Sequence, residues 1–280
     1  MSLPLVIDPN DLADRLADIQ TEGNTLAQAH LCLVDLRSAE AYAAGHLPGA
    51  VHGDAALLSR SESPVGGLLP ESEMVNSFLA GIGANPGDRI IGYDGGRETP
   101  AARMIWVLDA YGHTAASWLN GGFRAWQSAS LPISHSVHSP ARGTLALSLV
   151  GDNVMSVEAL MAELDSPTLA IVDVRSAAEF DGSDVRSAMG GHVPGARHLE
   201  WTAQLDDQGR LLDDDTLRKA LDERDIARDQ PIVVYCQTHQ RSSVTYVALR
   251  HLGYRDVRAL DGAWSHWGNR ADTPKSQGSA

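Results

Sequence analysis

Residues 171–179 read IVDVRSAAE, and residues 191–196 read GHVPGA. The same two motifs occur in the first half of the chain, as LVDLRSAE at residues 33–40 and GHLPGA at residues 45–50. The copies are 138 residues apart at the aspartate (173 − 35) and 146 apart at the histidine (192 − 46), so the second copy carries eight extra residues between the motifs. An internal repeat is therefore the first property to explain.

Two further motifs repeat in the same order. RIIGY at residues 89–93 matches PIVVY at residues 231–235, and LNGGFRAW at residues 119–126 matches LDGAWSHW at residues 260–267. Four matching blocks with no shorter period indicate a duplicated domain, because the units of solenoid proteins are only about 20 to 50 residues long. We therefore expect two domains with the same fold.

The hydrophobic pattern predicts the class of that fold. Short apolar runs rich in β-branched residues predict strands, at residues 31–36, 89–93, 169–174 and 232–235. Amphipathic stretches at residues 155–164 and 242–252 predict helices. Apolar strands that alternate with helices predict an α/β fold, in which each of two tandem domains has a central, mostly parallel sheet with helices on both faces.

The repeat also sets the expected domain limits. We expect the first domain at residues 1–133, a linker at 134–150, the second domain at 151–270 and a flexible tail at 271–280. The linker is expected because the sequence ISHSVHSP at residues 133–140 is polar and rich in residues that end helices and strands.

The composition restricts the partners. The 280 residues include 36 acidic and 22 basic ones, for a net charge of −14. Such a chain repels nucleic acid and anionic lipid, so an anionic substrate needs a local positive field. The sequence has no apolar run of about 20 residues and no signal-like N-terminus. We expect a cytoplasmic protein with no nucleic-acid or membrane partner, and its two cysteines fit a reducing compartment.

The second cysteine lies in the segment IVVYCQTHQRSSV at residues 232–244, a predicted strand that stops at Cys236, turns and enters a helix. This order places Cys236 at the carboxyl end of a central strand, where open α/β sheets bind ligands. A loop that curls into a helix start directs main-chain amides and the helix dipole inward. We expect this anion cradle to hold the sulfur as a thiolate or as a persulfide, which carries the same charge.

Six residues are predicted to form the cradle: Gln237, Thr238, His239, Gln240, Arg241 and Ser242. Arg241 adds a permanent positive charge that can neutralise an incoming anion, and an ion pair with an acidic residue is its alternative role. For His239 we expect a place at the rim of the pocket, where it shapes the access of the acceptor. A role as general base is less favoured, because sulfur transfer between thiolates needs little proton movement.

Together these motifs resemble a tandem-domain rhodanese, and the resemblance covers nearly all of the chain. It implies a thiosulfate sulfurtransferase, in which the cysteine of the second domain takes a sulfane sulfur from a small anionic donor and becomes a persulfide. The sulfur then passes to a thiophilic acceptor such as cyanide, and a sulfur-acceptor protein is a further partner. No organic cofactor and no metal is implied. The loop CQTHQRS resembles that of a bacterial variant.

The resemblance also suggests two residues that bind substrate. Arg186 lies in the polar insertion at residues 181–190, where family members carry an arginine. A second family arginine falls at Glu179, which has the opposite charge. Trp201 falls where family members often carry an aromatic residue that walls the site, and ordinary core packing is its alternative role.

The repeat separates structural residues from catalytic ones. Asp94 occupies the position of Cys236 (236 − 142), and a carboxylate cannot form a persulfide, so we expect the first domain to be catalytically silent. Asp173 and Arg175 have identical counterparts in this silent copy and are expected to form a structural ion pair. The histidines of the GHxPGA motifs recur likewise and are expected to brace the backbone. Cys32 lies in a predicted buried strand and is expected to be inert.

Three other functions stay open at this point. A 3-mercaptopyruvate sulfurtransferase would share the fold and the cysteine, and a non-catalytic carrier would hold the persulfide for another protein. A cysteine phosphatase also uses a thiolate in an anion cradle with an arginine. Only four residues separate Cys236 from Arg241 (241 − 236 − 1), which predicts a bed too small for a phosphoryl group.

Overall fold

The computed structural model describes residues 3–278, which divide into two compact units. The first unit comprises the residues up to Leu58, Pro70–Val150 and Asp206–Leu211. The second comprises Ser59–Leu69, Gly151–Leu205 and the residues from Leu212 onward. Each unit therefore contains a short segment from the other half of the sequence.

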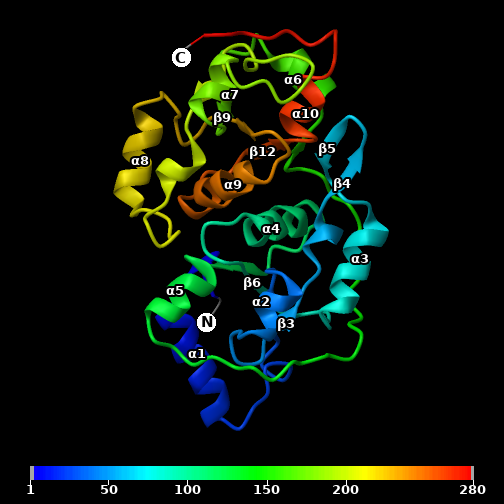
Figure 1. Ribbon diagram of the computed structural model, residues 1–280, viewed down its shortest axis with the longest axis vertical. Helices are drawn as coiled ribbons and strands as arrows, with labels where there is room; N and C mark the ends of the chain where they lie inside the picture. The colour runs from blue at the N-terminus through cyan, green and yellow to red at the C-terminus, as the bar shows by residue number, and fades with distance from the viewer. Residues whose placement is uncertain (1–2, 279–280) are drawn as a thin grey trace. The chain divides into compact units, whose positions relative to one another are not determined.

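A five-stranded parallel sheet forms the centre of each unit (Figure 1). In the first unit the order is β1-β7-β6-β2-β3, with β1 at Val6–Ile7, β2 at Leu31–Asp35, β3 at Val51–His52, β6 at Arg89–Tyr93 and β7 at Ala116–Leu119. In the second it is β10-β9-β11-β12-β8, with β8 at Val154–Met155, β9 at Ala170–Asp173, β10 at Arg197–His198, β11 at Ile232–Tyr235 and β12 at Val257–Leu260. Read from opposite edges, the two orders are the same.

Helices connect the strands and cover the sheets. In the first unit they are α1 (Pro9–Thr21), α2 (Ala39–Ala43), the 3-10 helix η1 (Ala55–Leu58), α3 (Ser72–Gly81), α4 (Pro100–Ala110) and α5 (Gly122–Ser128). In the second they are α6 (Val157–Glu163), α7 (Ala177–Asp181), η2 (Trp201–Gln204), α8 (Asp214–Asp222), α9 (Arg241–His251) and α10 (Ala263–Trp267). The predicted α/β fold with two alike domains is confirmed. An antiparallel hairpin, β4 (Arg60–Glu62) and β5 (Val65–Leu68), belongs to the second unit.

The repeated Asp-x-Arg motif is a buried ion pair, as predicted. Asp173 accepts hydrogen bonds from the main-chain N–H of Arg175 at 3.0 Å and from its guanidinium at 2.5 to 3.0 Å. The same guanidinium donates to the Gly191 carbonyl at 2.7 Å and lies 4.5 Å from the centre of the Trp264 ring. The motif therefore connects the end of β9 to the start of the GHVPGA turn.

The histidines of the two turns brace the backbone, which confirms their predicted role. The Nδ1 atom of His192 lies 2.8 Å from the Phe180 carbonyl oxygen, and the ring stacks on Phe180 at 3.8 Å. His46 has the same arrangement with Tyr42, at 2.8 Å and 4.0 Å. Since a carbonyl oxygen only accepts, Nδ1 of His192 is the donor in its contact with Phe180.

The segments that follow each domain are attached to the structure. Residues 136–150 contain no helix or strand, but Leu147 exchanges two hydrogen bonds with the Asn76 side chain in the first unit. Residues 271–278 differ from the flexible tail that we expected, because Thr273 is buried and Trp267 Nε1 donates to the Pro274 carbonyl at 2.8 Å. Residues 279–280 lie outside the described part of the chain.

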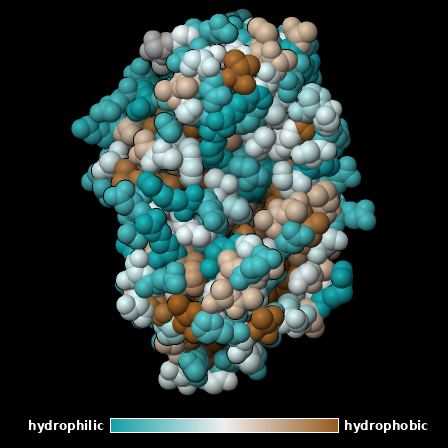
Figure 2. All heavy atoms as spheres, in the orientation of Figure 1, coloured by the Kyte–Doolittle hydropathy of each residue, from teal (hydrophilic) through white to brown (hydrophobic). Residues whose placement is uncertain are grey.

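One face of the surface is mostly hydrophilic. On the face drawn in Figure 2, hydrophilic residues predominate and hydrophobic ones lie in small, separate groups. Within residues 3–278, no helix has the length and apolar character needed to cross a bilayer.

The buried ion pair gives a prediction for stability. Replacing Arg175 by leucine leaves Asp173 as an unpaired buried charge, so we expect the free energy of unfolding of R175L to fall by about 3–5 kcal/mol in denaturant titrations. The control is R218L, since the Arg218 side chain is 40% exposed where it pairs with Asp214, and its loss is expected below about 1 kcal/mol. Equal losses in the two variants would contradict the structural role of Arg175.

Candidate active site

Cys236 follows directly after β11, the middle strand of the second sheet, and starts the turn into α9. β11 runs parallel to β9 and β12, so the carboxyl ends of the three strands meet at one edge of the sheet. Cys236 lies at this edge and is 1% exposed. The predicted order of strand, cysteine, loop and helix is confirmed.

The first turn of α10 holds the loop that begins at Cys236. The main-chain N–H of Trp264 donates to the Cys236 carbonyl at 2.9 Å, and the N–H of Ser265 donates to the Gln237 carbonyl at 2.8 Å. Helix N-termini have such N–H groups available because they lack partners within the helix. Gly262 precedes the helix with φ of 69°, so the chain enters α10 through a left-handed residue.

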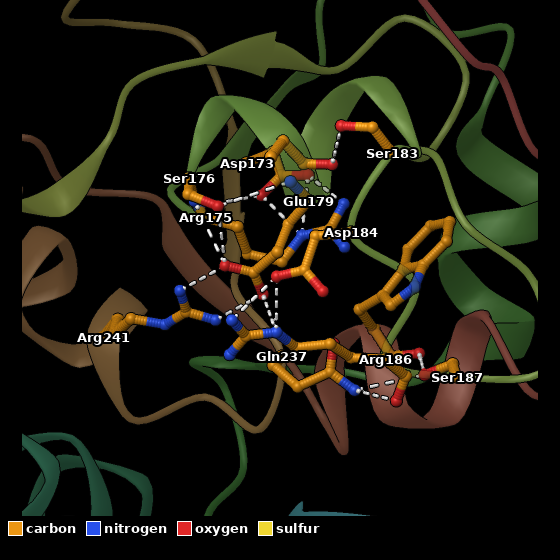
Figure 3. Close-up of polar contacts among 12 residues, drawn as sticks. Asp173, Arg175, Ser176, Glu179, Ser183, Asp184, Arg186, Ser187, Gln237 and Arg241 are labelled. Atoms are coloured by element: carbon orange, nitrogen blue, oxygen red, sulfur yellow. Dashed lines mark hydrogen bonds and ion pairs between the residues drawn. The ribbon is translucent and has the colours of Figure 1, made fainter.

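Arg241 is fixed by an acidic residue on α7. Its two terminal nitrogens donate to the two carboxylate oxygens of Glu179 at 2.6 and 2.8 Å (Figure 3). The Glu179 side chain is 2% exposed and that of Arg241 is 21% exposed, so this two-bond pair is largely shielded from water. The alternative that we considered for Arg241, an ion pair with an acidic residue, is therefore present.

The pKa values of this pair follow from its contacts. Burial raises the pKa of Glu179, but the hydrogen bonds and charge of Arg241 outweigh it and lower the pKa to about 2. Burial lowers the pKa of Arg241, but its hydrogen bonds to Glu179, the neighbouring Cys236 side chain and the Glu179 carboxylate raise it overall. The guanidinium thus stays charged beside the Cys236 sulfur.

The insertion at residues 181–190 lies against the cysteine loop. Gln237 Nε2 donates to the Arg186 carbonyl at 3.2 Å and to Ser187 Oγ at 3.1 Å (Figure 3). The Arg186 side chain is 53% exposed, donates to Asp184 at 2.8 Å and lies 3.8 Å from Glu179 Oε1. The structure therefore places Arg186 at the edge of the site. That Arg186 binds the sulfur donor stays a prediction.

The first unit has an acidic residue in the place of the cysteine. Asp94 is fully buried after β6, and its carboxylate accepts from the N–H groups of Gly96 at 3.0 Å and Ala101 at 3.2 Å. Its carbonyl accepts from the N–H of Phe123 in α5 at 2.8 Å, as that of Cys236 does from α10. Burial raises the pKa of Asp94 to about 6, although the hydrogen bonds from the two amides lower it in part.

Comparison with a known protein family agrees with this duplication. Residues 10–129 and residues 156–270 both match the family described as "Rhodanese-like domain". The chain belongs to the rhodanese family. The resemblance that the sequence motifs indicated is confirmed.

Relatives in this rhodanese family match the chain from end to end. A protein named thiosulfate sulfurtransferase from Azotobacter vinelandii is 40% identical over 273 residues, which cover 98% of this chain and 97% of the relative. A protein of the same name from Pseudomonas aeruginosa is 38% identical over 272 residues, which cover 97% of this chain and 97% of the relative. The crystal structure of SseA, a 3-mercaptopyruvate sulfotransferase from Escherichia coli, aligns with a TM-score of 0.78 at 28% identity, over 94% of this chain and 99% of that one.

One residue of the rhodanese loop, His239, does not lie where we expected it. His239 is fully buried in a left-handed conformation with φ of 50°, and its Nδ1 lies 2.6 Å from Ser242 Oγ. The rim position that we expected for His239 is therefore wrong, because the ring packs inward at the start of α9. Thr238 is partly exposed, and Gln240 immediately precedes α9.

Trp201 opens η2, which follows β10, and is partly buried. Its main-chain N–H donates to the carbonyl of Val174, the residue just after β9, at 3.1 Å. Trp201 thus lies at the same sheet edge as Cys236, and its role as a wall of the site stays a prediction.

The sequence analysis named Glu179 only as the residue in place of a family arginine and missed its ion pair with Arg241. Its visible signal is the sequence SAAE at residues 176–179, which forms a capping box at the start of α7. A capping box predicts a helix start and says nothing of an ion pair with a residue 62 positions later. No group of three His, Cys, Asp or Glu side chains within residues 3–278 is arranged to hold a metal ion.

The low pKa of Glu179 predicts a pH-dependent stability. Because this pKa is about 2 in the folded chain against 4.5 ordinarily, the ion pair stabilises the fold above pH 4.5 and this contribution is lost as the pH falls toward 2. In E179Q we expect unfolding to cost about 3 kcal/mol less at pH 7, and the difference should shrink below pH 4.5 in denaturant titrations. E223Q, which removes only an exposed pair with Lys219, is the control. A difference independent of pH would count against this pairing.

Proposed function

We propose that the chain is a sulfurtransferase that moves a sulfane sulfur through a persulfide on Cys236, with thiosulfate as donor and cyanide or another thiophile as acceptor. The observation that carries the proposal is the binding of the Asp94 carboxylate by two main-chain amides. The strand, loop and helix around Asp94 are similar to those around Cys236. In the second unit the corresponding position carries a sulfur with Arg241 beside it. The full-length relatives named thiosulfate sulfurtransferase support the same activity.

The transfer has two steps that balance without a proton. The Cys236 thiolate attacks the outer sulfur of thiosulfate, a new S–S bond forms, and sulfite leaves with the electron pair of the broken S–S bond. A cyanide carbon then attacks the outer sulfur of the persulfide, thiocyanate leaves, and the thiolate returns. Both enzyme forms carry one negative charge at sulfur, so the amides of residues 237–242 and the Arg241 charge stabilise both.

The remaining assignments extend this proposal. We place Arg186, at the exposed edge of the site, as a residue that attracts the anionic donor, and Trp201 as a wall of the site. The first domain, residues 1–133, is catalytically silent because Asp94 takes the place of the cysteine. The catalytic domain is residues 151–270. The two free cysteines fit a reducing compartment, which we take to be the cytoplasm.

The cysteine phosphatase is disfavoured by a second observation. Both terminal nitrogens of Arg241 donate to Glu179, so the two-pronged face of the guanidinium that such a mechanism needs for the phosphoryl oxygens is occupied. This adds to the short spacing between cysteine and arginine.

The nucleophile is tested by replacing each cysteine. We expect C236S to lose thiosulfate:cyanide turnover by at least about a thousandfold, because the hydroxyl is a poor sulfur acceptor. C32S is the matched control: burial raises the pKa of Cys32 to about 12, and its thiol donates to the Ile82 carbonyl. Multiple turnovers by the unaltered chain separate an enzyme from a carrier, and full activity in C236S would refute the assignment.

The donor is tested by comparing two substrates. The 3-mercaptopyruvate sulfurtransferase is the alternative that the Escherichia coli structure supports. With cyanide as acceptor, we expect kcat/KM for thiosulfate to exceed that for 3-mercaptopyruvate by at least about tenfold, which corresponds to about 1.4 kcal/mol of transition-state binding. The reverse order would make 3-mercaptopyruvate the donor and leave the Cys236 chemistry unchanged.

A further inference from the structure

The hairpin β4–β5 comes from the first half of the sequence but belongs to the second unit, where β5 lies beside α10 (Figure 1). The N–H of Gly66 donates to Ser265 Oγ at 2.9 Å, and that Oγ lies 2.8 Å from the Gly66 carbonyl. The N–H of Leu69 donates to Asp261 Oδ1 at 2.7 Å. The hairpin is thus attached to the N-terminal end of α10, the end that holds the cysteine loop.

The hairpin also touches the cysteine loop directly. A Cβ atom built on Gly67 would lie 2.0 Å from the Thr238 carbonyl oxygen, and one on Gly66 would lie 3.4 Å from Thr238 Cγ2. Gly67 has φ of 73°, a conformation that other residues adopt at a cost. Position 67 therefore needs glycine for two reasons, its backbone conformation and its close approach to Thr238.

Ser265 connects the two contacts. Its N–H donates to the Gln237 carbonyl of the cysteine loop, while its side chain binds Gly66 of the hairpin. Because a peptide group is planar and trans, fixing a carbonyl also fixes the N–H of the next residue in the opposite direction. Contacts at the Gln237 and Thr238 carbonyls therefore direct the N–H groups of Thr238 and His239 away from α10 and the hairpin.

The first unit repeats this arrangement around Asp94. Its segment Asp206–Leu211 comes from the second half of the sequence, and a Cβ on Gly209 would lie 2.0 Å from the Gly96 carbonyl oxygen. The N–H of Leu211 donates to Asn120 Oδ1 at 2.9 Å, as that of Leu69 does to Asp261. Gly96 stands two residues after Asp94, as Thr238 stands two residues after Cys236. Both loops are thus contacted at the same position by a glycine from the other half of the chain.

We propose that the hairpin β4–β5 is a positioning element of the sulfur-transfer site, in which Gly67 and Ser265 hold the Thr238 peptide so that the loop amides face the sulfur anion. The inference rests on the proposed function. Gly67 lies against the Thr238 carbonyl and Ser265 binds the Gln237 carbonyl, so both act through the loop. The first half of the chain, silent in its own loop, thereby supplies a part that the Cys236 site requires.

The duplication supplies a matched pair of variants for the test. G67A and G209A each add a methyl group 2.0 Å from a carbonyl oxygen at a glycine of positive φ, so similar losses of stability are expected. We expect G67A to lower kcat of thiosulfate:cyanide turnover by about tenfold, the equivalent of one hydrogen bond to the anion. G209A, at the silent loop, should leave kcat within about twofold of the unaltered chain. Equal losses of kcat in both variants would overturn the proposal.

A second measurement separates this proposal from the function itself. The rate of alkylation of Cys236 by iodoacetamide, followed by peptide mass spectrometry across pH, reports how well the loop stabilises the thiolate without any turnover. We expect the profile of G67A to move to higher pH and that of G209A to coincide with the unaltered chain. An unmoved G67A profile refutes the positioning role, whereas a moved profile in a chain without turnover refutes only the sulfurtransferase. If G67A does not fold, S265A is measured instead, with the same two readings.

Discussion

Two main-chain hydrogen bonds hold the loop that begins at Cys236. Trp264 and Ser265, in the first turn of α10, donate to the carbonyls of Cys236 and Gln237. With these carbonyls turned toward α10, the following N–H groups point away from it, as peptide planarity requires. The place of α10 is itself secured by Arg175, whose guanidinium lies against the Trp264 ring and binds Asp173 at the end of β9. The direction of the loop amides thus depends on backbone contacts set by the core.

The positive charge beside the cysteine loop is paired with a negative one. Arg241 follows Cys236 by five residues and carries a positive charge, yet Glu179 already binds both of its terminal nitrogens. The pair is neutral as a whole, which suits a buried place in a chain of net charge −14, since an unpaired buried charge is costly. Arg241 therefore serves as a fixed local charge, and the exposed Arg186 is the cation at the surface of the site.

Much of the fold was readable from the sequence because it rests on local patterns. Apolar runs predicted the central strands, and the repeated motifs predicted two alike domains, since a repeat in sequence implies a repeat in fold. The strand, cysteine and helix order placed Cys236. The pair of Glu179 and Arg241 was not readable, because ion pairs between distant residues leave no periodic signal. The exchanged segments at Gly67 and Gly209 were equally hidden, since each glycine reads as an ordinary turn residue.

The proposed sulfur transfer requires a sulfur anion held at Cys236, and peptide mass spectrometry measures its persulfide form directly. After incubation with thiosulfate and removal of the excess, the peptide that contains Cys236 is expected to carry one additional sulfur, while the Cys32 peptide carries none. Cyanide should then remove that sulfur and release thiocyanate in equal amount. A Cys236 peptide that gains no sulfur, in a chain that still turns over thiosulfate and cyanide, would contradict the account.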